Sequence, residues 1–242
     1  MTKNNLAIIV LNWNGADDAL ECINSLARQT LKPTIIIVDN HSHDDSVMRF
    51  EQYQTEHPSV NCTIIANDKN LGFAGGINTG LVYARKQGFE YIGVLNPDAI
   101  ADKKWCQALV GELSSQPKCG IATGILQRRD GKTLDTTGDF YTTWGLPGPR
   151  NRDEPVENAP SKPGEVFGAT GGGAIYRAAM FDDIDMFDED FFMYYEDVDL
   201  SFRAQLAGWK VRFTPKAIAY HKVGASSKKV PGLAVYNTFK NL

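Results

Sequence analysis

Two runs of acids in the last quarter of the chain have the composition of a proton-transfer site. Asp188-Glu-Asp190 and Glu196-Asp-Val-Asp199 flank an aromatic run from Phe191 to Tyr195. Aromatic neighbours desolvate a carboxylate and raise its pKa toward the range of a general base. Acids at the start of a helix also suit the helix dipole, so helix capping is the structural alternative. We favour a catalytic carboxylate here.

Carboxylates also follow two predicted strands at the points where these strands end. Asp39 stands in Val38-Asp-Asn40, and Asp98 closes Leu95-Asn-Pro-Asp98. Open α/β sheets bind ligands at such strand ends, where an acid can hold a ribose hydroxyl or a base edge. An oxygen ligand there can hold Mg²⁺ or Mn²⁺ against a diphosphate. The structural alternatives are a helix cap at the first acid and a turn at the second.

A glycine-rich segment, Asn70 to Gly80, leads into a predicted helix. Close backbone approach and the positive end of a helix suit a phosphate group. The segment is not a P-loop, because Leu81-Val82 follows where Lys and Ser or Thr are required, and it lacks the dinucleotide-binding spacing. A phosphate-binding segment and a plain tight turn both remain open.

His221 follows an apolar run and precedes Gly224-Ala-Ser-Ser227. A histidine in this position ligates a metal or has a structural role, and its residue type alone allows both. Ser226 to Lys229 could add hydroxyls and positive charge beside a phosphate, or form a solvated tail.

The elements that must position these residues alternate between strand and helix in the first half. Short β-rich runs separated by amphipathic stretches predict βαβ crossovers and a mostly parallel sheet. The predicted strands cover residues 6–11, 34–39, 62–66, 91–95 and 120–126.

The second half has a different pattern. Residues 127–143 predict a hairpin that turns at Asp130-Gly131. Residues 145–163 carry five prolines and few apolar side chains, so we expect a mobile surface loop. A helix is expected from Tyr194 to Gly208, followed by short strands at 211–214 and 217–221.

Composition restricts the function classes. The 242 residues suit one large domain or two small ones, and a net charge of -4 argues against a nucleic-acid partner. No apolar run approaches the roughly 20 residues of a membrane helix, so a membrane contact would come through a lipid-linked substrate, a partner or a segment outside this chain. The four cysteines lack a C-x-x-C pair and indicate a reduced, cytoplasmic chain (Cys22, Cys62, Cys106 and Cys119).

The motifs occur in one order along the chain: Asp39, the glycine segment, Asn96-Pro-Asp98, Gly171-Gly-Gly173, Glu196-Asp197 and His221. This order resembles the inverting nucleotide-sugar glycosyltransferases of family 2, which have the GT-A fold, and most of all their bacterial rhamnosyltransferase-type branch. The resemblance spans Ile8 to about Ser227. It implies an α/β fold in one domain, with a Rossmann-like nucleotide-sugar half (1–126) around a mostly parallel sheet and a mixed acceptor half (127–242).

The resemblance also implies a role for each motif. Asp197 matches the general base, with Glu196 beside it, and Asp98 and His221 match ligands of a divalent metal, Mg²⁺ or Mn²⁺. Gly171, Gly172 and Gly173 match a segment beside the sugar and acceptor. The residues placed on the nucleotide-sugar side are Asn12, Asp39, Asn70, Gly72, Asn78, Asn96 and Asp98.

This sequence departs from the family pattern in two places. Asn96 stands where many members have the first acid of a D-x-D motif, which implies that the metal is held more weakly or through fewer carboxylates. The chain stops at Leu242, where many relatives continue with further helices, so we expect either one domain of a longer protein or a truncated chain.

The function implied is inverting transfer of a sugar from a donor of the dTDP-rhamnose or UDP-hexose type. The acceptor is a hydroxyl of a glycan or lipid-linked glycan, as in bacterial cell-surface polysaccharide or O-antigen synthesis, with peripheral membrane contact through that acceptor at the inner face of the plasma membrane. Two alternatives from other classes remain. They are a nucleotidyltransferase and a non-catalytic nucleotide- or glycan-binding module.

Overall fold

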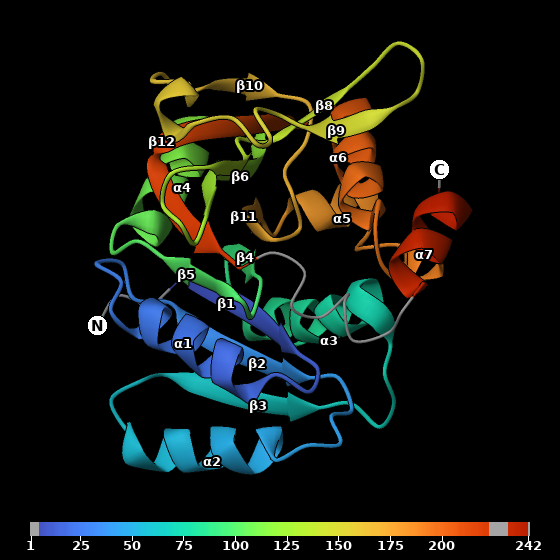
Figure 1. Cartoon of the computed structure of the whole chain (residues 1–242). Coiled ribbons are helices and arrows are strands. Elements are labelled where there is room, and N and C mark those ends of the chain that lie inside the picture. Colours follow the sequence, from blue (N-terminus) through green and yellow to red (C-terminus); the bar gives the residue numbers. More distant parts are fainter. Residues whose placement is uncertain (1–4, 223–231, 242) are drawn as a thin grey trace.

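The computed structural model describes residues 5–222 and 232–241, and within them one ten-stranded sheet runs through the molecule (Figure 1). Its main path is β10-β12-β6-β11-β4-β1-β2-β3, with β5 paired to β12 and β7 paired to β6. The strands are β1 (Leu6–Asn12), β2 (Thr34–Asp39), β3 (Cys62–Ala66), β4 (Tyr91–Leu95), β5 (Ala99–Ala101), β6 (Cys119–Arg128), β7 (Leu134–Thr136), β10 (Gly164–Val166), β11 (Gly173–Arg177) and β12 (Lys210–His221).

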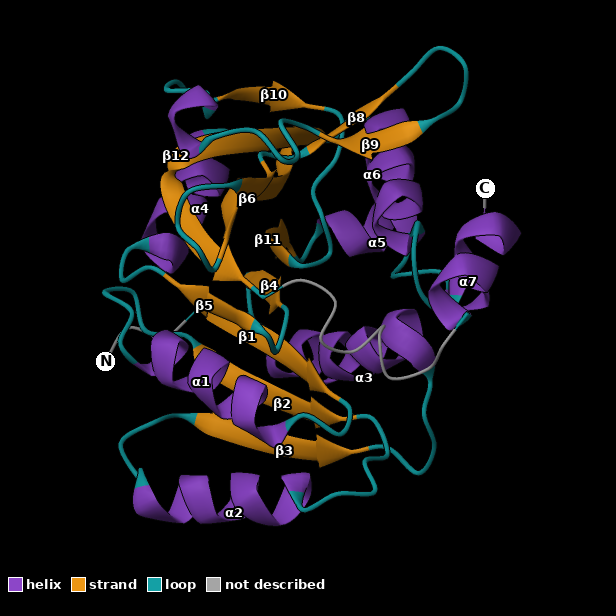
Figure 2. Cartoon of the chain, in the orientation of Figure 1, coloured by secondary structure: helices purple, strands orange, loops and turns teal. Residues whose placement is uncertain are grey.

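Helices cover the sheet, and a small hairpin stands apart from it (Figure 2). The α-helices are α1 (Ala16–Ala27), α2 (Ser46–Glu56), α3 (Gly72–Gln87), α4 (Trp105–Ser115), α5 (Met180–Ile184), α6 (Glu196–Leu206) and α7 (Leu233–Asn241). The hairpin is β8 (Asp139–Tyr141) with β9 (Pro147–Pro149), and two short 3-10 helices lie at Val156–Asn158 and Glu189–Phe191.

The first four strands run parallel and are covered on both faces, as the continuous apolar runs predict. Alternate residues of β1 point to opposite sides of the sheet. Ile8 and Val10 belong to the core that includes α1, whereas Ala7 and Ile9 belong to the core that includes α3. The carboxyl ends of these strands therefore lie at one edge, between two helical layers.

One antiparallel strand joins the two halves of the chain. β11 pairs antiparallel with both β4 and β6, and β6 pairs parallel with β12. The expected division at residue 126 falls inside β6, so the halves share a strand. The mostly parallel α/β fold with a mixed second half is confirmed.

The glycine segment has a different role from the expected turn. The helix already begins at Gly72, and it lies very close to β1. A Cβ atom at Gly76 would stand 2.5 Å from Leu11, and one at Gly80 would stand 2.8 Å from Ile9. These two glycines therefore allow α3 to pack on the sheet, which spacing along the sequence does not reveal.

Two further expectations are wrong in part. The two short strands predicted after Gly208 are one strand, β12, with an irregular register between Phe213 and Ile218. The segment 145–163, expected to be a mobile loop, contains β9 and a 3-10 helix and makes backbone hydrogen bonds: Asp153 donates to Leu134, which itself donates to the carbonyl of Glu154. Its mobility remains a prediction.

No helix among the described residues is both long and apolar enough to cross a membrane. The four cysteines are buried free thiols, as expected from their apolar surroundings.

Candidate active site

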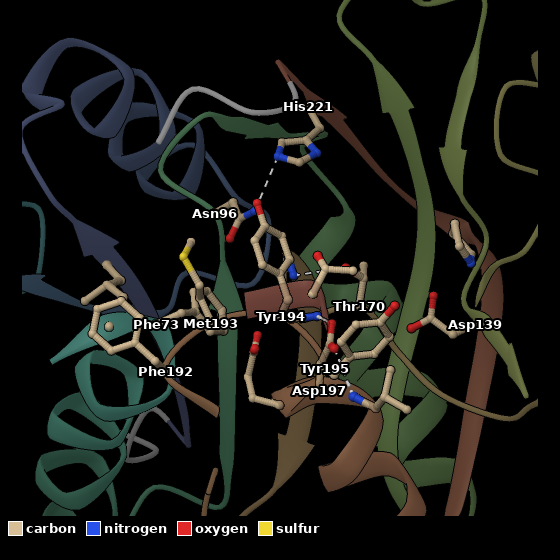
Figure 3. Close-up of a pocket in the computed structure, with 18 of the residues that line it drawn as sticks. Phe73, Asn96, Asp139, Thr170, Phe192, Met193, Tyr194, Tyr195, Asp197 and His221 are labelled. Carbon is tan, nitrogen blue, oxygen red and sulfur yellow. Dashed lines mark hydrogen bonds between the residues drawn. The ribbon is translucent and has the colours of Figure 1, made fainter. Parts of the chain in front are cut away.

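A cavity of about 580 Å³ opens at the carboxyl ends of β1, β2 and β4. Residues from both halves of the chain line it: Trp13 and Asn40 follow strands of the first half, and Arg152 and Thr170 come from the second. In Figure 3, Asn96, Asp139, Asp197 and His221 are grouped around this cavity, and they come from different elements. The cavity therefore lies where open α/β sheets usually bind their ligands.

At the end of β2 the cavity is lined by Asn40 and not by Asp39. The carboxylate of Asp39 is buried and accepts hydrogen bonds from the side chain of Asn12 at 2.9 Å and from the hydroxyl of Ser42 at 2.6 Å. Neither Asp39 nor Asn12 reaches the cavity wall in this structure. Nucleoside contact by these two residues remains a prediction.

The side chain of Asn40 connects the end of β2 to the start of α3. Its amide nitrogen donates to Asn70 at 2.9 Å and to the carbonyl of Gly72 at 2.8 Å, while its oxygen accepts from the backbone of Leu71 at 3.0 Å. Asn70 and Gly72 both line the cavity, as the resemblance implies. Asn40 was not among the residues predicted for the site, because an asparagine that follows an aspartate at the end of a strand has no distinctive sequence signal.

Asn78 lies away from the cavity wall. Its amide donates to the carbonyl of Phe187 at 2.8 Å and to Glu189 at 3.0 Å, and it accepts from the backbone of Phe187 at 3.1 Å. In this structure Asn78 holds the segment from Phe187 to Glu189 in place. It was expected to face the nucleotide side, and it does not.

Gly72 provides a direct test of this packing. Its φ is +72°, and a Cβ atom there would stand 2.4 Å from the carbonyl oxygen of Phe192. Gly72→Ala is therefore expected to lower the free energy of unfolding by about 1–3 kcal/mol or more, from backbone strain alone. Gly111→Ala is the matched control, since nothing lies within 4 Å of its Cβ position and helix propensity favours Ala by about 1 kcal/mol. If urea unfolding gave Gly72→Ala the same free energy of unfolding as the wild type, the role of Gly72 would be contradicted.

His221 and two carboxylates form the polar end of the cavity. Its Nε2 lies 3.0 Å from Asp98 Oδ1, and its Nδ1 lies 2.8 Å from Asp135 Oδ2. Burial on its own lowers the pKa of this imidazole, but the hydrogen bonds and charges of Asp135 and Asp98 outweigh burial and raise the pKa to about 9. Sequence reasoning predicted Asp98 and His221 together, and the structure brings them into contact.

The Asp98–His221 pair fits a divalent metal with few protein ligands. Two adjacent ligands about 2.1 Å from an octahedral ion stand about 3 Å apart, and the observed separation is 3.0 Å. Among the described residues no group of three or more His, Cys, Asp or Glu is arranged to hold a metal. Mg²⁺ and Mn²⁺ sites often use one or two protein ligands and complete their shell with phosphates and water. Asn96, whose Nδ2 is 3.3 Å from His221 Nε2, occupies the place of a further acid.

Asp197 stands on the cavity wall at the first turn of α6. Its Oδ2 accepts from the backbone N–H of Gly171 at 2.7 Å, and its Oδ1 accepts from that of Val198 at 2.9 Å. Burial raises the pKa of Asp197, and the backbone hydrogen bonds oppose this only in part. The helix begins two residues later than expected, because Tyr194 and Tyr195 have φ angles of +68° and +70°.

Glu196 is more deeply buried than Asp197. Only 5% of it is exposed, and its Oε2 has no hydrogen-bond partner among the described residues. Burial, followed by the charge of Asp197, raises the pKa of Glu196 well above its usual value. A buried carboxyl that is kept protonated avoids the cost of an unpaired charge. Glu196 therefore suits the role of a neutral neighbour to Asp197.

The three glycines after Thr170 connect Asp197 to Asn96. Gly171 donates to Asp197, and the carbonyl of Gly172 accepts from the backbone of Asn96 at 3.0 Å. A Cβ atom at Gly172 would stand 3.0 Å from Asn96 Nδ2. Gly171 and Gly172 line the cavity, whereas Gly173 begins β11 and does not.

Three charged residues at the cavity were missed: Asp135, Asp139 and Arg152. All three come from the segment that we had divided into a hairpin and a mobile loop. Burial and the charge of Asp197 raise the pKa of Asp139 well above its usual value. Acids spaced four residues apart in a predicted hairpin are usual on a solvated face, so only the fold shows that they point inward.

Comparisons with known proteins agree on one family and one fold. The family model described as Glycosyl transferase family 2 matches residues 7–185. The chain is 24% identical over 249 residues to the N-acetylglucosaminyl-diphospho-decaprenol L-rhamnosyltransferase of Mycobacterium tuberculosis (strain ATCC 25618 / H37Rv), covering 93% of this chain and 78% of that protein.

Two solved structures share the architecture. One is GalNAc-T7 with UDP, GalNAc and Mn²⁺, with a TM-score of 0.71 and 14% identity over 90% of this chain and 43% of that one. The other is the mannosyltransferase PcManGT from Pyrobaculum calidifontis with GDP-Man and Mn²⁺, with a TM-score of 0.69 and 16% identity over 92% of this chain and 58% of that one. At these identities the likeness concerns the fold, which is the GT-A fold of glycosyltransferases.

Proposed function

The chain belongs to glycosyl transferase family 2, and on this premise we propose that it transfers a sugar, with inversion, from a nucleotide-diphosphate sugar to a hydroxyl of a glycan or lipid-linked glycan. The observation that supports this most is the arrangement of one cavity. A carboxylate of raised pKa, Asp197, and a metal-ligand pair, Asp98 and His221, line the same space of about 580 Å³.

The polar end suits the leaving group. When the glycosidic bond breaks, the diphosphate gains negative charge, and a divalent ion held by Asp98 and His221 would stabilise that charge. Arg152 also lines the cavity and is positively charged. Asn70 lines the cavity on the nucleotide side, where its Oδ1 accepts hydrogen bonds from Asn40 and from the backbone of Gly72, which orient its side chain.

The other end suits the acceptor. Asp197 accepts the proton of the acceptor hydroxyl while that hydroxyl attacks the anomeric carbon on the face opposite the diphosphate. One displacement of this kind inverts the anomeric centre. Hydrogen bonds from Gly171 and Val198 hold the carboxylate in place, and they leave its remaining lone pairs for the hydroxyl. Asp139, on the same cavity, is a further polar group for acceptor hydroxyls.

One relative supports the donor and acceptor classes that we propose. The Mycobacterium tuberculosis protein is named for L-rhamnose transfer to a decaprenol-linked acceptor. For this chain we propose a donor of the dTDP-rhamnose or UDP-hexose type and a lipid-linked glycan acceptor met at the inner face of the plasma membrane. The aromatic residues Phe192, Tyr194 and Tyr195 on the cavity wall suit stacking against sugar rings.

Incubation with UDP-, dTDP- and GDP-sugars, with and without Mn²⁺, tests the reaction class. Glycoside formation with an added glycan, or slow donor hydrolysis without one, is expected. Release of pyrophosphate would instead support a nucleotidyltransferase, and binding without turnover would support a non-catalytic module.

The pKa of Asp197 gives a pH prediction. Only the ionised carboxylate can accept the proton, so transfer should decrease as pH falls through the pKa of Asp197. Because burial raises that pKa above the usual value of 3.8, the decrease should begin at a higher pH than for an exposed aspartate. Measuring kcat against pH, with circular dichroism to confirm folding, checks this. A rate that stays constant down to pH 4 would contradict Asp197 as the base.

A further inference from the structure

Asp135 is a buried carboxylate for which neither the sequence motifs nor the proposed reaction has a role. It lies on β7, and 3% of its side chain is exposed. Burying a charged group is costly unless it is paired and hydrogen-bonded. Both of its oxygens have partners: Oδ2 is 2.8 Å from His221 Nδ1, and Oδ1 is 2.6 Å from Arg152 Nη2.

The backbone directs this side chain by a local irregularity. In the pairing of β6 with β7, Leu126 stands opposite Thr136 and Gln127 stands opposite Leu134. Asp135 is therefore the extra residue of a β-bulge. Bulges re-aim side chains and are common beside active sites. Here the bulged residue contacts His221 at the end of β12, a strand that pairs with the other edge of β6.

The carboxylate decides which nitrogen of His221 carries a proton. An ionised carboxylate only accepts hydrogen bonds, so Nδ1 must donate to it. Arg152 is a permanent cation and donates to Oδ1 at 2.6 Å, so the carboxylate of Asp135 forms a charge-assisted pair in which it is ionised. In the metal-free protein Nε2, which faces Asp98 at 3.0 Å, is protonated as well; a metal would displace that proton, and because Nδ1 keeps its own, the lone pair of Nε2 would then be the one that binds the metal.

We propose that Asp135 is a positioning residue that holds Nδ1 of His221 protonated and thereby presents Nε2, beside Asp98, to the metal. This inference rests on the proposed metal site at Asp98 and His221. Carboxylates that bind the distal nitrogen of a ligating histidine typically affect metal affinity by about 10–100-fold.

Asp135→Asn is the informative variant because of Arg152. The asparagine has one acceptor oxygen, and the guanidinium of Arg152, which only donates, requires it. The NH₂ group then faces Nδ1, which must become an acceptor, so Nδ1 loses its proton and Nε2 keeps its own. The variant keeps the size of the side chain and favours the tautomer of His221 in which Nε2, the nitrogen that the metal needs, is protonated.

Two measurements test this. In metal-free wild-type protein, ¹⁵N–¹H spectra should show a slowly exchanging Nδ1–H of His221, assigned by its absence in His221→Gln; only four histidines are present. In Asp135→Asn this signal should disappear, and calorimetric Mn²⁺ affinity in the presence of UDP should fall about 10–100-fold. Asp153→Asn is the control, since that carboxylate pairs with Arg128 on the surface and should change neither readout.

Retention of Nδ1–H and of Mn²⁺ affinity in Asp135→Asn would overturn the proposal. If that variant fails to fold, the wild type with saturating Mg²⁺ decides, because Nδ1–H should persist when metal binds Nε2 and would vanish if metal bound Nδ1. Wild-type protein that binds no Mn²⁺, with or without UDP, overturns the proposed metal site, and the metal-free Nδ1–H result then decides the role of Asp135 by itself.

Discussion

Asp197→Asn is expected to lower sugar transfer by about 10²–10⁴-fold, the usual contribution of a positioned acid or base. Asparagine keeps the size of the side chain but cannot accept the proton of the acceptor. Donor affinity should change little, because Asp98, His221 and the start of α3 line a different part of the cavity. Steady-state turnover and calorimetry with UDP and Mn²⁺, on the same preparations, separate chemistry from binding.

Two variants on the same helix serve as comparisons. Asp199→Asn changes an acid two residues along that pairs with Arg203 at 2.6 Å and does not line the cavity, so turnover should be nearly unchanged. Glu196→Gln should be milder than Asp197→Asn, because Glu196 is proposed to be protonated already. If Asp197 only caps α6, Asp197→Asn would cost about 1 kcal/mol of stability and keep most of its turnover. That outcome would exclude it as the base.

Asp98→Ala is expected to abolish the part of nucleoside diphosphate affinity that depends on Mn²⁺. Asp98 supplies the one carboxylate of the proposed metal pair, and Asn96 offers only an amide in the neighbouring place. Losing a direct ligand should exceed the roughly 10–100-fold effect of losing an outer partner. Calorimetry of UDP with and without Mn²⁺ measures this difference.

The control for Asp98→Ala is Asp102→Ala, four residues along in the same connection. Asp102 accepts a hydrogen bond from the backbone of Lys104 on the exposed surface and has no contact with the cavity. It should lower stability slightly and leave the Mn²⁺ effect intact. An unchanged Mn²⁺ effect in folded Asp98→Ala would remove Asp98 from the metal site.

The sequence alone determined the parallel half of the fold and the order of the motifs. Short apolar runs alternate with amphipathic helices, and a run buried on both faces is hydrophobic throughout, so β2 and β3 have the predicted bounds. Because parallel strands carry their carboxyl ends to one edge, Asp98 and Asn96 could be placed at a ligand site from local pattern. The partners Asp197 and His221 followed from the resemblance to a family.

Only the tertiary structure decided which polar residues point into the cavity. Asp39 and Asn78 have the residue types of a binding site, yet their hydrogen bonds are directed at Asn12, Ser42 and Phe187. Asp135 belongs to the site because a β-bulge turns its side chain toward His221, which is 86 residues away along the chain. Sequence periodicity reports which face of an element is buried. It contains no information on register shifts or on contacts between distant elements, and these set the direction of each side chain.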